Sequence, residues 1–112
     1  MNMLNSIILE GNVVRSLSDC EGVKDFEIEV IRYYKKEDNS MVEEKDFFTV
    51  ELYGNLADSP LIIKNIEVGR GIRVVGRLKQ KRWENEGKTF SKIVVIAEHI
   101  EFKARKQILP TD

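Results

Sequence analysis

Residues 71–83 read GIRVVGRLKQKRW, and the two-residue period of their apolar positions predicts a long β-strand. Successive side chains of a strand point to opposite faces, so residues of one parity share a face. One face is apolar and suits a protein core; it consists of Ile72, Val74, Gly76 and Leu78. The opposite face is cationic and ends in an aromatic ring; it consists of Arg73, Val75, Arg77, Lys79, Lys81 and Trp83.

Four further stretches have the same period and predict four more strands, at residues 5–14, 25–34, 45–54 and 88–102. Three of these strands have a clear apolar face for the core, formed by Ile7 and Leu9, by Phe26, Ile28 and Val30, and by Phe48, Val50 and Leu52. Residues 35–45, KKEDNSMVEEK, are expected to form a charged, flexible hairpin loop. Residues 85–87, NEG, are expected to form a turn.

A short helix is expected between the third and fourth strands, within residues 55–69, NLADSPLIIKNIEVG. Ser59 would cap its first turn, Pro60 fits the first helical position, and Gly69 would end it. Five strands with one short helix between strands 3 and 4 is the layout of the OB-fold, an all-β fold that forms a small barrel. We therefore expect residues 1–104 to form one OB-fold domain and residues 105–112 to form a short C-terminal tail.

The basic residues are concentrated in one segment of a chain whose net charge is -1. Between Arg70 and Lys92 there are eight Lys or Arg and two acidic residues, whereas the rest of the chain has ten basic and seventeen acidic residues. A polyanion responds to the local potential, so this segment favours contact with nucleic acid despite the net charge. The candidates for binding phosphates are the cations of the outward face of residues 71–83: Arg73, Arg77, Lys79 and Lys81.

Two further rings, Phe47 and Tyr53, have outward parity in the strand of residues 45–54, with Thr49 and Glu51 between them. Rings mixed with cations on a solvent-facing surface suit single-stranded nucleic acid, because bases stack on rings and Lys or Arg bind phosphates. A duplex hides the faces of its bases, so exposed rings favour single strands. The alternative interpretation is that the basic strand is only a solvated face and that Trp83 packs across the strands.

Other classes of function find little support in the sequence. The acidic residues are scattered, with no nucleophile motif and no glycine-rich nucleotide loop, so we expect neither an enzyme nor a bound cofactor. The single cysteine, Cys20, and the single histidine, His99, are too few for a zinc site. No stretch approaches the ~20 apolar residues needed to span a bilayer. No signal peptide is evident either, so we expect a cytoplasmic, nucleoid-associated protein without a membrane partner.

Three stretches, in order, resemble the bacterial single-stranded DNA-binding protein family over about residues 5–102. NSIILEGNVV (5–14) resembles the first strand of that family, DFFTVELYGNLAD (46–58) its central motif, and GRGIRVVGRLKQKRW (69–83) its basic strand that ends in tryptophan. The resemblance implies an OB-fold that assembles as a homotetramer, with a dimer as the smaller alternative. It also implies binding of single-stranded DNA in DNA replication, recombination and repair, without sequence preference and without catalysis.

The resemblance also implies which residues bind the DNA. The base-stacking positions of the family are matched by Phe47, Tyr53, Trp83 and either Tyr33 or Tyr34, and the four cations named above would contact phosphates. Parity favours Tyr33 over Tyr34 as the outward ring. Three glutamates at outward parity, Glu27, Glu29 and Glu51, lie near the predicted surface and oppose phosphate binding.

The family usually continues into a flexible linker with an acidic tip that recruits replication or repair proteins, whereas this sequence ends at ILPTD. We therefore expect either a short member of the family without that tip or a member whose tip is missing from this sequence. A rival resemblance is to the primosomal replication protein, a short dimeric OB-fold that also binds single strands but mainly docks a helicase-loading partner. A third interpretation is an OB-fold module that only mediates protein contacts, with an acidic partner on the basic strand.

Overall fold

The computed structural model describes residues 1–105, which form five strands and two short helices. In chain order the elements are β1 (Ile7–Cys20), β2 (Val23–Lys35), β3 (Met41–Leu52), α1 (Gly54–Asp58), α2 (Pro60–Asn65), β4 (Gly71–Asn85) and β5 (Lys88–Phe102). The strands close into a barrel in the order β1-β2-β3-β5-β4, with β3 and β5 parallel and the other neighbours antiparallel. The predicted OB-fold is confirmed. Of the predicted tail, residues 106–112 lie outside the described part of the chain.

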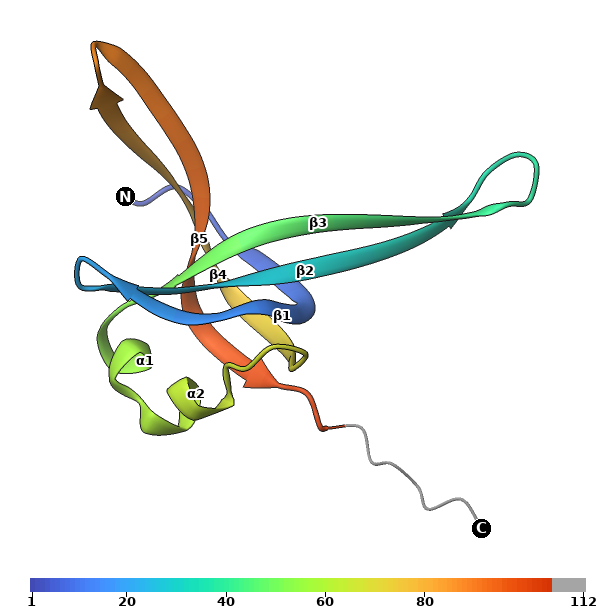
Figure 1. Cartoon of the computed structure of the whole chain (residues 1–112), viewed down its shortest axis with the longest axis horizontal. Coiled ribbons are helices and arrows are strands. Elements are labelled where there is room, and N and C mark those ends of the chain that lie inside the picture. The colour runs from blue at the N-terminus through green and yellow to red at the C-terminus, as the bar shows by residue number, and fades with distance from the viewer. Residues whose placement is uncertain (106–112) are drawn as a thin grey trace.

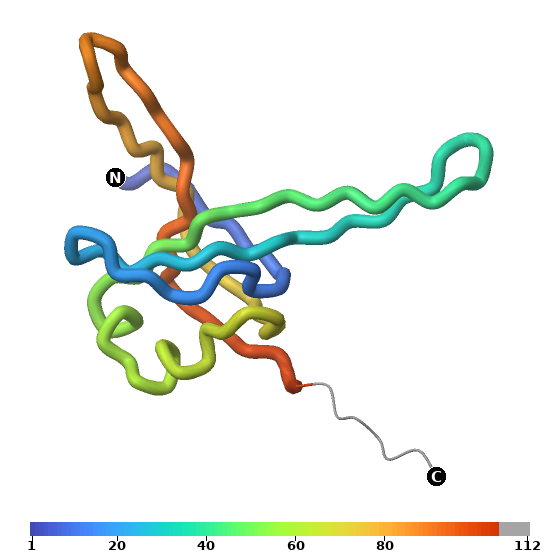
Figure 2. The backbone as a smooth tube through the Cα atoms, in the orientation of Figure 1, coloured from blue at the N-terminus to red at the C-terminus, as the bar shows by residue number. Residues whose placement is uncertain are grey.

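Two long hairpins, β2–β3 and β4–β5, extend from the barrel in different directions (Figure 1). Figure 2 shows the two strands of each hairpin running side by side to its tip. The β2–β3 ladder continues to the pair of Lys35 and Met41, so the linking loop is only residues 36–40. The prediction of a loop over residues 35–45 is therefore wrong for Lys35 and for residues 41–45, which belong to the strands. Each added antiparallel pair satisfies backbone groups that a loop would leave to water, which favours the longer ladder.

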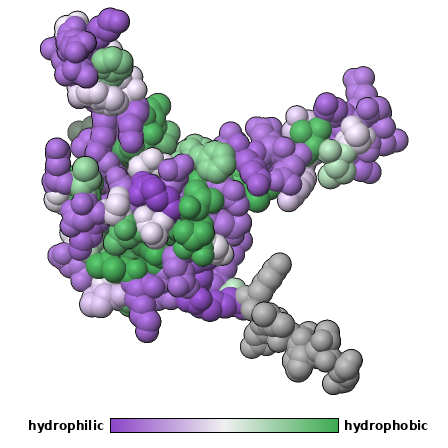
Figure 3. Space-filling view, viewed as in Figure 1, coloured by the Kyte–Doolittle hydropathy of each residue, from purple (hydrophilic) through white to green (hydrophobic). Residues whose placement is uncertain are grey.

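The core consists of the apolar faces that the alternation predicts. Its largest fully buried side chains include Phe26, Ile28, Leu52 and Ile72, and Ile7, Leu9, Val30 and Phe48 pack partly buried against them. Figure 3 shows hydrophobic residues gathered over the barrel body, while hydrophilic residues dominate the tips of both hairpins. The barrel body therefore provides the apolar burial, and the hairpins are largely solvated extensions of it.

Leu78 is the exception among the predicted core residues, because it is 39% exposed. The last pair between β1 and β4 joins Ile7 to Gly76, so β4 leaves the barrel wall before it reaches Leu78. Beyond that pair, the side chain of Asn5 bonds to the backbone of Leu78 in place of a β1 residue. Its Nδ2 donates to the Leu78 carbonyl at 2.8 Å, and its Oδ1 accepts the Leu78 N–H at 3.0 Å. The register of β4 with β5 shifts between Val75 and Gly76, close to the point where β4 leaves β1.

The segment between β3 and β4 holds two short helices where one was predicted. Ser59 is extended (φ -78°, ψ 115°), so it ends α1 and caps α2, and its Oγ accepts the Ile62 N–H at 3.3 Å. A residue before proline is pushed out of the helical region, which explains why one helix does not run through Ser59–Pro60. The predicted cap is confirmed, but α2 ends at Asn65, and Gly69, at φ +92°, lies in the turn before β4.

Both helices lie at one end of the barrel, below the strands in Figure 1. Leu56, Ala57 and Ile62 pack against the core from this end. Neither helix approaches the length of apolar helix that a membrane crossing requires, and the same holds for all of residues 1–105. The helices therefore close one end of the barrel and leave the outward faces of β3 and β4 uncovered.

Candidate single-stranded nucleic-acid interface

The closure of the barrel brings the outward rows of β3 and β4 to one surface. Glu51 of β3 pairs with Ile96 of β5, and Ile96 pairs in turn with Arg77 of β4. The aromatic row and the cationic row are distant in sequence, but they lie on strands separated only by β5. We call this surface the aromatic–basic face and define it by six residues: Phe47, Tyr53, Arg77, Lys79, Lys81 and Trp83.

The three predicted rings of the aromatic–basic face are each about half exposed: Phe47 by 55%, Tyr53 by 43% and Trp83 by 46%. Aromatic side chains are usually more buried than this, so each of the three has surface that a ligand can contact. Tyr33 and Tyr34 lie further out, on the β2–β3 hairpin, where they are 60% and 39% exposed. The guanidinium of Arg32 lies 5.8 Å from the centre of the Tyr34 ring, so Tyr33 is the more open of the two.

Trp83 stacks on Phe90 across the β4–β5 hairpin, with ring centres 5.9 Å apart and ring planes inclined by 19°. The alternative interpretation, that Trp83 packs across the strands, is therefore correct for one part of the ring. Phe90 itself is 43% exposed and was missed in the sequence. The predicted NEG turn could have revealed this contact. A tight turn that pairs Asn85 with Lys88 sets the hairpin register and so places Trp83 directly opposite Phe90.

The four predicted phosphate contacts fall into two groups. Arg77 and Lys79 are exposed on the aromatic–basic face. Arg73, in contrast, is held by two carboxylates, with its Nε 2.7 Å from Glu10 and its Nη1 3.4 Å from Glu101. The hydrogen bond with Arg73 lowers the pKa of the Glu10 carboxyl below its usual value. Arg73 would have to leave both carboxylates before it could bind a phosphate.

Lys81 is held by Glu51, and this pair corrects a prediction. Glu51 is only 2% exposed, so it is not the surface glutamate that its parity suggested. The Tyr53 hydroxyl donates to Glu51 Oε1 at 2.6 Å, and the Lys81 ammonium pairs with Oε2. The hydrogen bond to Glu51 raises the pKa of the Tyr53 phenol, and the Lys81 pKa is raised by the same kind of contact. A buried carboxylate requires such partners.

A hollow of about 520 Å³ lies beside these residues. Glu51, Lys81 and Trp83 line one part of it, and the β1–β2 turn lines another with Cys20 and Glu21. The aromatic–basic face is therefore concave next to Trp83 and not flat. The hollow offers the Trp83 ring to an unpaired base, whereas Glu21, Asp25 and Glu51 offset its two lysines, Lys81 and Lys92, so phosphate contacts are expected from Arg77 and Lys79 outside it.

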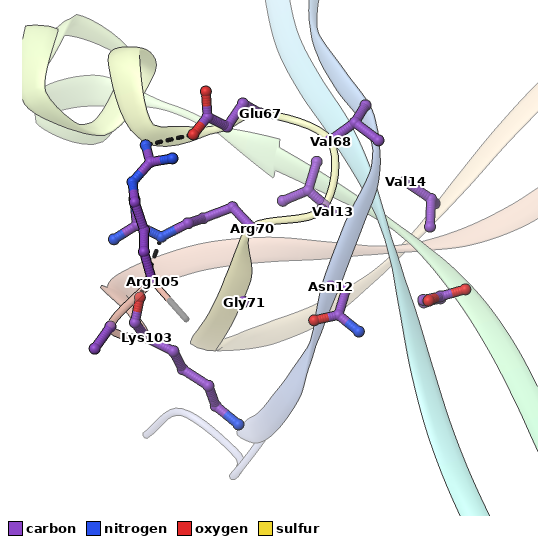
Figure 4. Close-up of a pocket in the computed structure, with 12 residues that line it drawn as sticks. Asn12, Val13, Val14, Glu67, Val68, Arg70, Gly71, Lys103 and Arg105 are labelled. Carbon is purple, nitrogen blue, oxygen red and sulfur yellow. Dashed lines mark hydrogen bonds and ion pairs between the residues drawn. The ribbon is translucent and has the colours of Figure 1, made fainter. Parts of the chain in front are cut away.

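A second hollow, of about 800 Å³, lies between β1, the loop before β4 and residues 103–105 (Figure 4). Its arginines are engaged within the protein: Arg105 pairs with Glu67, and Arg70 donates from Nε to the Lys103 carbonyl at 3.1 Å and from Nη1 to Asn65 at 3.0 Å. None of the described residues that line it is aromatic. It lacks the rings that an unpaired base would need, so the aromatic–basic face remains the candidate site.

A comparison with protein families identifies the chain. The model of the single-strand binding protein family matches residues 4–103. The chain belongs to this family. Among curated relatives, the single-stranded DNA-binding protein of Aquifex aeolicus is 35% identical over 103 residues, which cover 88% of this chain and 69% of the relative. The single-stranded DNA-binding protein of Fusobacterium nucleatum is 28% identical over 108 residues, covering 92% and 69%.

Solved structures of the family share the fold. A Plasmodium falciparum SSB complex with ssDNA superposes with a TM-score of 0.76 at 22% identity, covering 93% of this chain and 98% of that one. The small single-stranded DNA-binding protein of Streptomyces coelicolor gives a TM-score of 0.68 at 26% identity, covering 92% and 96%. The resemblance noted in the sequence is thus confirmed as membership of the single-strand binding protein family.

Proposed function

We propose that this member of the single-strand binding protein family binds single-stranded DNA without sequence preference and without catalysing a reaction. The observation that carries the proposal is the aromatic–basic face, where three half-exposed rings and the exposed cations Arg77 and Lys79 lie on the outward side of barrel strands joined through β5, with a hollow beside Trp83. The names of the Aquifex and Fusobacterium relatives support it. A protein with this activity would act in DNA replication, recombination and repair.

In this proposal, bases stack on the rings and phosphates meet the cations. Phe47, Tyr53 and Trp83 each offer a platform worth about 1–3 kcal/mol per stacked base. Tyr33 or Tyr34 extends the path along the β2–β3 hairpin. Arg77 and Lys79 provide the phosphate contacts, because Arg73 and Lys81 are held by carboxylates in the free protein.

A labelled oligo-dT strand, titrated in the presence of an unlabelled duplex competitor, tests the function. We expect tight binding at about 20 mM salt that weakens steeply by about 300 mM, because binding releases counterions from the phosphates. The duplex should compete poorly, since its bases are not open to the rings. Equal competition by the duplex, or no binding at low salt, would contradict the proposal and favour an OB-fold that only docks a protein partner.

Replacing Arg77 with Gln should lower the salt dependence of binding and leave the preference among bases unchanged. Each phosphate contact on a single strand contributes about 0.7 to the slope of log K against log salt, so the slope should fall by about that amount. Arg82→Gln is the matched control, because Arg82 has the opposite parity in β4 and donates to Gln80. An Arg77 variant whose slope equals that of the control would remove Arg77 from the interface.

We also propose that the chain self-associates, as a homotetramer by analogy with its family. Within the described residues, the register of β1 with β2 begins at Asn12, so residues 7–11 of β1 pair with β4 alone. Ile8 lies in this half-paired stretch and is 65% exposed. An apolar, half-paired strand invites association with another strand.

Ile8→Glu should therefore lower the mass of the assembly in sedimentation without unfolding the chain, because a buried charge in an interface opposes association. Leu61→Glu is the matched control: Leu61 lies on α2, far from β1 in sequence, and is similarly exposed at 69%. The same mass for the Ile8 variant and the unaltered protein would exclude β1 as the association surface.

A further inference from the structure

Glu51 is the only charged or polar side chain that is buried among residues 1–105. It lies in β3 between two half-exposed rings of the same parity, Phe47 and Tyr53. An apolar residue could have been buried at this position instead. Replacing a buried ion pair by apolar residues is often neutral or stabilising, so the core does not need Glu51. Its position in the hollow beside Trp83 connects it to the aromatic–basic face.

We propose that Glu51 sets the affinity of this face for single-stranded DNA by holding Lys81 away from the phosphates and by fixing the orientation of the Tyr53 ring. The inference rests on the proposed function. It makes Glu51 a positioning residue, since its carboxylate acts through the side chains of Lys81 and Tyr53 and does not itself meet the DNA.

The first half of the inference follows from the pairing of Lys81. The ammonium group is bound to a carboxylate that is 2% exposed. A phosphate could recruit Lys81 only by leaving this buried carboxylate without its cation, and an unpaired buried charge is strongly unfavourable. Lys81 therefore adds little to phosphate binding in the unaltered protein, although its position in β4 matches a phosphate contact.

The second half follows from the Tyr53 hydroxyl. Its hydrogen bond of 2.6 Å to Glu51 Oε1 fixes the rotation of a ring that is 43% exposed. A ring that is already ordered before binding loses less conformational freedom when a base stacks on it. Glu51 thus weakens the interface at Lys81 and strengthens it at Tyr53.

Glu51→Gln separates the two halves, because the amide keeps an oxygen to accept the Tyr53 hydroxyl and removes the charge that holds Lys81. We expect a salt slope steeper by about 0.7, so the gain in affinity for oligo-dT should be about sevenfold larger at about 20 mM than at about 300 mM salt. The double variant Glu51→Gln/Lys81→Gln should return the slope to its original value. Glu29→Gln is the matched control, an outward glutamate on β2 opposite Phe47.

Tyr53→Phe tests the other half and keeps the ring. We expect binding weaker by about two- to tenfold, with an unchanged salt slope, since the ring is no longer fixed by its hydroxyl. An unchanged affinity for Tyr53→Phe, or a slope for Glu51→Gln equal to that of Glu29→Gln, would overturn the corresponding half of the proposal.

A readout without DNA keeps this inference separate from the proposed function. The absorbance of ionised tyrosine, taken as the difference between the protein and its Tyr53→Phe variant, follows the Tyr53 phenol alone. The hydrogen bond to Glu51, burial and the charge of that carboxylate raise its pKa in the unaltered protein; Glu51→Gln keeps an acceptor but removes the charge, so the pKa should fall part of the way towards the usual value. An unchanged titration would overturn the proposed arrangement even if DNA binds. If the Tyr53 pKa falls in Glu51→Gln but the protein binds no oligo-dT, the proposed function would be refuted. Only the hydrogen bond between Tyr53 and Glu51 would then be supported.

Discussion

Replacing Trp83 with Ala is expected to weaken the binding of oligo-dT by about 1–3 kcal/mol, which is the typical contribution of one base stacked on one ring. This corresponds to a loss of affinity of about 5- to 150-fold. The reason is geometric: Trp83 is 46% exposed, it edges the hollow of the aromatic–basic face, and its other side is supported by the stacked ring of Phe90. Direct titration of the variant at low salt measures the effect.

The control for this prediction is Trp83→Phe, which keeps a ring at the same place and should retain most of the affinity. Because stacking does not involve counterions, the salt slope should be the same in both variants. Phe90→Ala should have a smaller effect than Trp83→Ala, since it removes the support and leaves the platform. If Trp83→Ala bound oligo-dT as tightly as the unaltered protein, Trp83 would be a packing residue only.

Gly76→Ala is expected to destabilise the barrel by about 3 kcal/mol or more, the upper end of what overpacking usually costs. A Cβ at this position would lie 2.0 Å from the Ile96 carbonyl oxygen and 3.2 Å from the Ala97 Cα. Both are backbone atoms of β5, so a side chain cannot turn away to relieve the clash. The register of β4 and β5 shifts at the same place, and the last pair of β1 with β4 is made by Gly76. Urea unfolding measures the loss.

Gly71→Ala is the matched control in the same strand. There a Cβ would lie 3.2 Å from the Cβ and 3.3 Å from the Cδ of Lys103, so a small shift of residue 103, which follows the end of β5, relieves the contact. Replacing glycine by alanine at a compatible position stabilises a protein by about 0.4–1 kcal/mol through the unfolded chain, so this variant should be near neutral or slightly more stable. Equal unfolding midpoints for the Gly76 and Gly71 variants would contradict the close approach of β4 and β5.

The alternation of apolar and polar residues alone predicted most of the fold, because each strand buries one of its faces and therefore needs apolar residues at every second position. Phe26, Ile28 and Ile72 are all fully buried, as their parity predicts. The exposure of Phe47 also followed from parity, since the opposite face of its strand is apolar, and that of Trp83 followed from its place in the outward cationic row. These features depend on neighbours within one strand, which a sequence displays directly.

Two of the errors arose where strands from distant parts of the chain meet. Glu51 has outward parity, but Lys81 and Tyr53 contact it where β3 closes on β5, and no local pattern reveals that contact. Leu78 has inward parity, but β4 has already left β1 at that point. The break between the two helices could have been predicted from the sequence, because Pro60 disfavours the helical conformation for Ser59.

The most direct test of the central claim is the fluorescence of Trp83 during titration with oligo-dT at about 20 mM and about 300 mM salt. The chain has one tryptophan, so the signal reports on the aromatic–basic face alone. We expect saturable quenching at low salt, because a base stacks on the ring, and a clearly weaker affinity at high salt, because Arg77 and Lys79 compete with counterions. Binding without any change of fluorescence, or no binding at low salt, would contradict the claim that this face holds single-stranded DNA.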